Sequence, residues 1–181
     1  YNAGNIASEF RRRLKAAELA GGWSPGLVNG WTQRFTAGSL LQDNEYRAEP
    51  GRVAPVPLPV GNELRALFFR YQLLEVAYFK MKNHNLIERT EYFQLGFNSN
   101  LQVTRSMQSL GSTRSDWLFS GTLGDGYTLS KGQILLASAT LERRIATTAV
   151  PMTQAGMAIK YYGQQNQQSL WYAALSADRI R

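Results

Sequence analysis

The hydrophobic pattern changes its period near residue 96, and this change constrains the fold more than any other feature of the chain. In residues 5–20 and 63–82, apolar residues recur at intervals of three and four, which is typical of amphipathic helices, whereas residues 23–60, with their spaced glycines and prolines, predict mostly loop. After residue 96, short apolar segments alternate with glycine-containing turns, which is typical of β-strands. Helical patterns followed by consecutive strands favour an α+β domain with an antiparallel sheet over an alternating βαβ fold.

Residues 5–20 predict the first helix. Apolar residues recur there at helical spacing, and Gly21-Gly22 would end the helix. The opposite side would carry the densest positive cluster of the chain, which consists of Arg11, Arg12, Arg13 and Lys15. A solvated helix face is the simpler interpretation of this cluster, and contact with an anionic partner is the alternative.

Residues 63–82 give the strongest helical signal, and Asn62 is suited to cap its start. Its apolar stripe consists of Leu64, Leu67, Tyr71, Leu74, Tyr78 and Met81. Further apolar residues widen the stripe, and a helix that is apolar over most of its circumference is usually buried on more than one side. We therefore expect either a central core helix or a second face that meets another subunit through Phe69, Leu73 and Val76.

The rest of the chain predicts about four to six antiparallel strands. The candidate strands are residues 117–123, 127–129, 134–141, 145–150, 157–162 and 170–175, with a tight turn at 124–126 and a hairpin loop at 163–168. A chain of 181 residues fits one domain. We expect a single α+β domain over residues 1–181, helical over about 5–95 and β-rich over about 97–181, with one or two N-terminal helices packed on the C-terminal sheet.

The net charge of +7 favours anionic partners such as nucleic acid, lipid head groups or acidic proteins. Besides the positive cluster near the N-terminus, Arg143 and Arg144 are candidate contacts because they follow a predicted strand. Aromatic residues on the last strands would offer surfaces on which bases could stack. No RNP1-type or KH-type motif accompanies them, so nucleic acid stays an alternative partner.

The chain contains no cysteine, and His84 is its only histidine. Cysteine nucleophiles and zinc sites of the usual Cys/His type are therefore excluded. His84 follows a predicted helix end, where an imidazole more often contacts free carbonyl groups than acts as a base. The carboxylates form no paired motif, and Gly121, Gly124 and Gly126 lack the lysine and the helix of a phosphate-binding loop. We expect no enzymatic activity, no cofactor and no metal.

No segment approaches the roughly 18 consecutive apolar residues that a membrane helix needs, so we expect no transmembrane segment in this chain. The chain begins with Tyr1, which suggests that an anchor or a signal preceded it. Cysteine and N-glycosylation sites, the usual markers of compartment, are both missing. The compartment stays open, with an extracytoplasmic or virion-associated location favoured.

Three functions remain open. The first is a non-enzymatic assembly or scaffold subunit of a larger complex, such as a secretion or pilus-like apparatus or a capsid, that associates with copies of itself or with partner proteins. The missing catalytic motifs and the wide apolar surface of the second predicted helix favour this function. The alternatives are a basic nucleic-acid-binding domain and an extracytoplasmic ligand-binding module.

Overall fold

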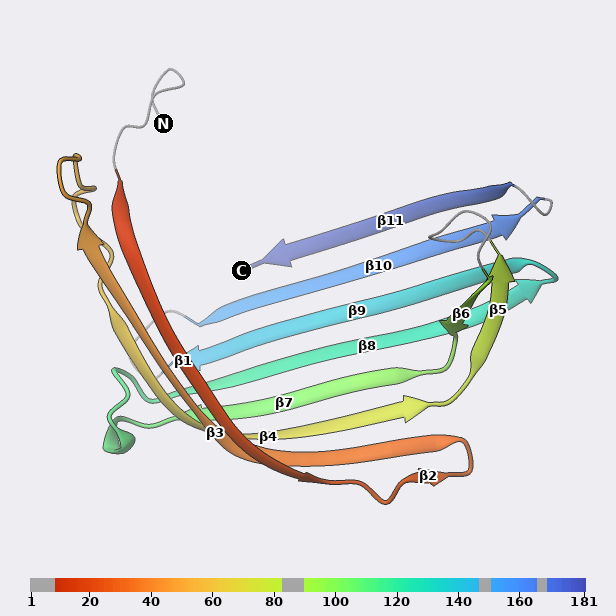
Figure 1. Ribbon diagram of the computed structural model, residues 1–181, viewed down its shortest axis with the longest axis horizontal. Coiled ribbons are helices and arrows are strands. Elements are labelled where there is room, and N and C mark those ends of the chain that lie inside the picture. Colours follow the sequence, from red (N-terminus) through yellow and green to blue (C-terminus); the bar gives the residue numbers. More distant parts are fainter. Residues whose placement is uncertain (1–8, 83–89, 147–150, 166–168) are drawn as a thin grey trace.

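The computed structural model describes residues 9–82, 90–146, 151–165 and 169–181, and these residues are almost entirely β-sheet (Figure 1). Apart from the strands, they include one short 3₁₀-helix, η1 (Gln108–Leu110). The strands are β1 (Phe10–Trp23), β2 (Leu27–Val28), β3 (Trp31–Ala48), β4 (Asn62–Glu75), β5 (Tyr78–Lys82), β6 (Thr90–Gln94), β7 (Asn98–Ser106), β8 (Asp116–Ser130), β9 (Gln133–Ala146), β10 (Met152–Gln164) and β11 (Leu170–Ile180).

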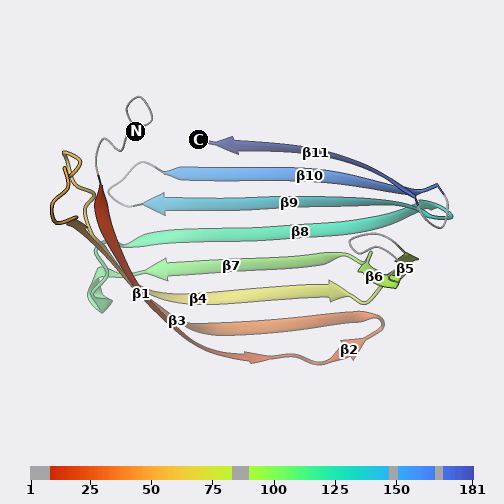
Figure 2. The ribbon, with the colours of Figure 1, turned by 45° about the horizontal axis from the view of Figure 1, so that its top comes forward.

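The long strands form one antiparallel sheet in the order β1-β3-β4-β7-β8-β9-β10-β11, while β2 pairs with β3 and the β5–β6 hairpin is separate. Apart from β2 and the β5–β6 hairpin, strands that follow one another in the sequence are neighbours in the sheet, as is usual for antiparallel strands. Figure 2 shows the strands from β3 to β11 side by side in this order. The sheet is strongly curved, and β1, β3 and β4 bend along their length (Figure 1).

The expected helix over residues 5–20 is wrong, because residues 10–23 are strand β1 and pair along their whole length with β3. The helical spacing was coincidental. Phe10 and Leu14 lie on one face of the strand and Ala17 on the other, since successive strand residues point to opposite faces. The pattern that decides the structure is the period-two series Ala17, Leu19, Gly21 and Trp23.

The expected helix over residues 63–82 is also wrong, because this stretch forms β4, a short connection and β5. Both faces of β4 carry apolar residues, such as Phe68 on one face and Phe69 on the other. A segment that is apolar all round does not distinguish a buried helix from a strand by its period. With both helices replaced by strands, the α+β class and the division into a helical and a β-rich half are wrong as well.

The prediction of antiparallel strands in the second half is confirmed in outline, but the strands are longer than expected. β8 runs through the predicted turn at residues 124–126, and β9 begins after a turn at residues 131–132. Residues 147–150, the end of the candidate strand 145–150, lie outside the described residues. The sheet has nine strands where four to six were expected.

Among the described residues, no second layer covers the sheet beyond the segment at Leu95, which packs on Ile134. The exposed surface is 12838 Å², whereas a compact monomer of 20.3 kDa exposes roughly 8,800 Å². Buried hydrophobic side chains are few: Ala66, Phe68, Leu95 and Ile134 among the described residues. A water-soluble domain of this size would bury a core between layers. This sheet instead leaves most of both faces exposed, and its few buried side chains do not form an extended core.

Candidate functional site

The register of the sheet places the odd-numbered residues of the long strands on one face and the even-numbered residues on the other. In each of the seven pairings from β1 to β11, odd-numbered residues lie opposite odd-numbered residues; the register shifts only at the end of β8. Directly opposed residues in an antiparallel pair point to the same face. Odd positions therefore form one continuous face of the sheet, and even positions form the other.

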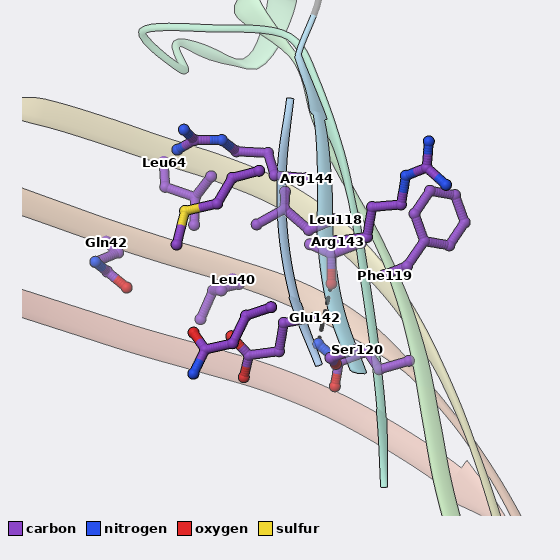
Figure 3. A pocket seen from close by; sticks show the side chains of 13 residues that line it. Leu40, Gln42, Leu64, Leu118, Phe119, Ser120, Glu142, Arg143 and Arg144 are labelled. Atoms are coloured by element: carbon purple, nitrogen blue, oxygen red, sulfur yellow. Dashed lines mark hydrogen bonds between the residues drawn. The ribbon is translucent and has the colours of Figure 1, made fainter. Parts of the chain in front are cut away.

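The even positions form the concave face. Buried side chains such as Phe68 and Thr104 have even numbers, and a hollow of about 380 Å³ is lined mainly by even-numbered residues. Figure 3 shows Leu118 and Arg144 directed into this hollow, whereas Phe119 and Arg143 point to the other side of the strands. The odd positions consequently form the convex face.

The convex face carries an apolar band that continues across all the long strands. The band consists of the odd positions within residues 17–23, 35–41, 67–73, 99–103, 117–123, 135–141, 155–161 and 171–177. None of these positions holds a charged residue. Several of the side chains are highly exposed, including Leu19 at 77%, Leu175 at 72% and Met157 at 64%. An exposed apolar patch of this extent marks a surface that contacts something other than water.

The strands are tilted relative to this band. A line of directly paired residues runs straight across the sheet, perpendicular to the strands. It starts at the centre of the band on β1 and consists of six pairings that join Ala20, Gly38, Phe68, Thr104, Leu118, Arg144 and Met152. The centre of the band on β10 is Ala158, six residues beyond Met152. This offset corresponds to about 20 Å along the strand over about 29 Å of sheet, which is a tilt of about 35°.

The height of the band follows from the same geometry. On β9 the first polar convex positions on either side of the band are Gln133 and Arg143. Their separation of about 10 residues spans roughly 33 Å along the strand. Because the strand is tilted by about 35°, the height of the band, measured in the sheet and perpendicular to the band's long direction, is about 27 Å. The hydrocarbon core of a bilayer is about 30 Å thick.

All four tryptophans of the chain occupy odd positions at the margins of the band. Trp23, Trp31 and Trp171 lie at one margin, and Trp117 lies at the other. Trp23 stacks on Phe35 with ring centroids 6.0 Å apart. Tryptophan is enriched where an apolar medium meets water, because its ring is apolar and its N–H donates a hydrogen bond.

The concave face carries hydrogen-bonded polar side chains beside apolar ones such as Leu40 and Leu118. Arg70 donates a hydrogen bond from Nε to Gln102 Oε1 at 2.7 Å and lies 3.6 Å from a carboxylate oxygen of Glu18. Arg12 donates to Asn44 Oδ1 at 2.7 Å. These side chains come from four adjacent strands, so the concave face holds two polar clusters that suit contact with water.

The predicted anionic-partner residues are divided between the two faces. Arg11, Arg13, Lys15 and Arg143 lie on the convex face, all at the same margin of the apolar band, whereas Arg12 and Arg144 lie on the concave face. The structure therefore does not bring all six together. Strands β1 and β9, far apart in the sequence, instead place the four convex cations along one rim.

The residues of the predicted protein interface lie on or beside a strand and not on a helix, with Phe69 and Val76 exposed and Leu73 half-buried. Phe69 and Leu73 belong to the apolar band, and Val76 follows the end of β4 at 39% exposure. The sequence analysis missed most of the remaining band. The sequence does signal this band, because apolar and polar residues alternate along the strands. The alternation is clearest in parts of β9 and β11, where apolar odd positions alternate with even positions such as Ser138, Thr140 and Ser176.

The described residues offer no conventional chemical centre. No group of three or more histidine, cysteine, aspartate or glutamate side chains in this part of the chain is placed to hold a metal ion. His84 lies outside the described residues. No helix within the described ranges is long and apolar enough to cross a membrane. Comparisons with protein-family models, with curated proteins and with solved structures gave no match.

Proposed function

We propose that this chain is a structural component of a membrane, in which the apolar band of the convex face contacts lipid hydrocarbon and the concave face borders water. The observation that carries the proposal is the uncharged band of nearly constant height that crosses every long strand. Its height of about 27 Å and the strand tilt of about 35° agree with the apolar height of about 25 Å and the tilt of 35–45° of transmembrane antiparallel sheets. Such sheets occur in outer membranes, and we assign the chain to that setting.

The proposal keeps the structural role expected from the sequence but changes what covers the apolar surface. It also replaces the expectation of no transmembrane segment, which rested on apolar runs of helix length alone. A second protein subunit would have to follow the convex curvature over all the long strands, whereas lipid adapts to any convex outline. The placement of tryptophan at both margins also favours a bilayer, because the two margins then coincide with the two membrane–water interfaces.

In a membrane, the outer edges of the two end strands, β1 and β11, must be paired with further strands. In hydrocarbon each unpaired backbone group costs several kcal/mol, so every edge must be paired. The proposal therefore requires further strands beside the outer edges of β1 and β11, either from this polypeptide or from another. Neither end strand contains proline, the residue that prevents regular pairing.

The native tryptophans allow a direct test. The protein is reconstituted into vesicles of phosphatidylcholine that carries bromine at defined depths of the acyl chain, and tryptophan emission is measured. We expect bromines near the head group to quench emission more strongly than bromines near the bilayer centre, because all four tryptophans border the band. Emission that no brominated lipid quenches, from protein that does not float with the vesicles, would refute the proposal.

A further inference from the structure

The two margins of the apolar band differ in charge. At one margin the convex face carries arginine or lysine on β1, β3, β4, β7, β9 and β11, at the positions Arg11, Arg13, Lys15, Arg47, Arg65, Arg105, Arg143 and Arg179. At the opposite margin no odd position of these strands holds arginine or lysine. The charge is therefore concentrated along one rim of the convex face.

Part of this rim is neutralised by acidic residues of the chain. Arg11 pairs with Glu49 at 2.7 Å, Arg47 pairs with Glu45 at 3.2 Å, and Arg65 pairs with Asp43. The remaining cations, Arg13, Lys15, Arg105, Arg143 and Arg179, have no carboxylate within 4.0 Å among the described residues. We call these five residues the cationic rim.

Three members of the cationic rim lie on the part of the sheet formed by β7 to β11. The guanidinium of Arg105 lies 4.9 Å from the ring centroid of Trp117, and Arg143 is directly opposite Phe119. Arg179 lies on β11 opposite Ala155 of the band. The acidic residues of these strands at this margin, Asp116, Glu142 and Asp178, occupy even positions and so belong to the concave face.

From this arrangement we propose that the cationic rim binds the phosphate groups of anionic phospholipids, so that this margin lies in the more anionic leaflet. The inference rests on the membrane role proposed above. Guanidinium groups bind phosphate oxygens with two parallel hydrogen bonds. The aromatic and aliphatic residues beside them belong to the apolar band, so a lipid held by its phosphate would lay its acyl chains on that band.

The test compares lipids at the surface of the protein in vesicles. The protein is reconstituted in phosphatidylcholine with a trace of spin-labelled phosphatidylglycerol or spin-labelled phosphatidylcholine, and the motionally restricted fraction of each label is measured. One cation near the membrane surface favours an anionic lipid by about 1 kcal/mol, which is about fivefold. We expect the wild-type protein to prefer phosphatidylglycerol by about this factor.

The variant Arg105→Gln/Arg143→Gln/Arg179→Gln keeps Arg13 and Lys15 of the cationic rim, so it is expected to lose most of the preference while it still restricts phosphatidylcholine. The matched control, Arg34→Gln/Lys131→Gln/Lys160→Gln, removes the same charge from the concave face and from a turn at the opposite end, and it should keep the preference. Equal loss in both variants, or a preference that is undiminished in the rim variant, would overturn the inference. If neither spin label is restricted by the wild-type protein, the membrane role itself fails. Nucleic-acid binding that is lost with the rim, while the lipid preference is retained, would assign the rim to nucleic acid.

Discussion

Two neighbouring residues of β9 offer a direct comparison of the two faces. Ala139 lies near the centre of the convex band, opposite Leu123 and Met157, which are 43% and 64% exposed. Ser138 lies on the concave face, opposite Gly124 and Ala158. Both positions are exposed, and both have space for a longer side chain. They differ only in the medium that we propose on each side.

Arginine at these two positions should therefore have unequal effects on stability. On the lipid face of a transmembrane sheet an arginine costs about 2–4 kcal/mol near the bilayer midplane, whereas surface substitutions in water usually change stability by less than about 0.5 kcal/mol. We expect Ala139→Arg to weaken folding into vesicles about 30- to 1,000-fold and Ser138→Arg to change it little. The assay is reversible folding from urea into phosphatidylcholine vesicles, followed by electrophoretic mobility and tryptophan emission. Equal costs for the two variants would refute the assignment of the faces.

The remaining predictions concern the packing and the polar face. In Gly38→Ala the new Cβ would lie 2.9 Å from Ala20 Cα and would also meet the carbonyl oxygen of Leu19, so we expect a loss of about 1–3 kcal/mol in urea unfolding; Gly21→Ala, where nothing lies within 4 Å, serves as the control. A harmless Gly38→Ala would contradict the close approach of β1 and β3. In Glu18→Gln the ion pair with Arg70 is removed from a partly exposed site, so we expect a loss below about 1 kcal/mol that shrinks further in high salt; a larger loss that is independent of salt would show that the concave face is dry.

The sequence allowed the strands of the second half to be predicted because each of their faces has its own chemistry. In residues 137–142 of β9 and 175–178 of β11, small or apolar odd positions alternate with hydroxyl and charged even positions, and this period of two is typical of a strand. β4 lacked this contrast, because Leu64 and Phe68 on the concave face add to the apolar residues of the convex face. The adjacent aromatic residues of β4 favour a strand by propensity, but its apolar spacing fits a helix equally well.

The candidate site was harder to predict because the search assumed that apolar residues gather in a core. In this sheet the apolar alternate positions face outward and the polar ones face the concave side, which is the reverse of a soluble sheet with one covered face. The register also had to be known before Arg143 and Arg13 could be assigned to one rim. Odd-numbered residues of all the long strands share one face only because the turns between the strands keep odd positions opposite odd positions. The lengths of these turns were the least accurate part of the prediction.

The account is tested most directly by a cysteine series along β9, since the natural chain contains no cysteine. Single cysteines at positions 137–142 are labelled with an environment-sensitive fluorophore in vesicles and are exposed in turn to lipid-borne and aqueous quenchers. The account predicts strict alternation: positions 137, 139 and 141 are quenched from the lipid, and positions 138, 140 and 142 are quenched from water. Quenching from water at all six positions would contradict a lipid-facing convex surface.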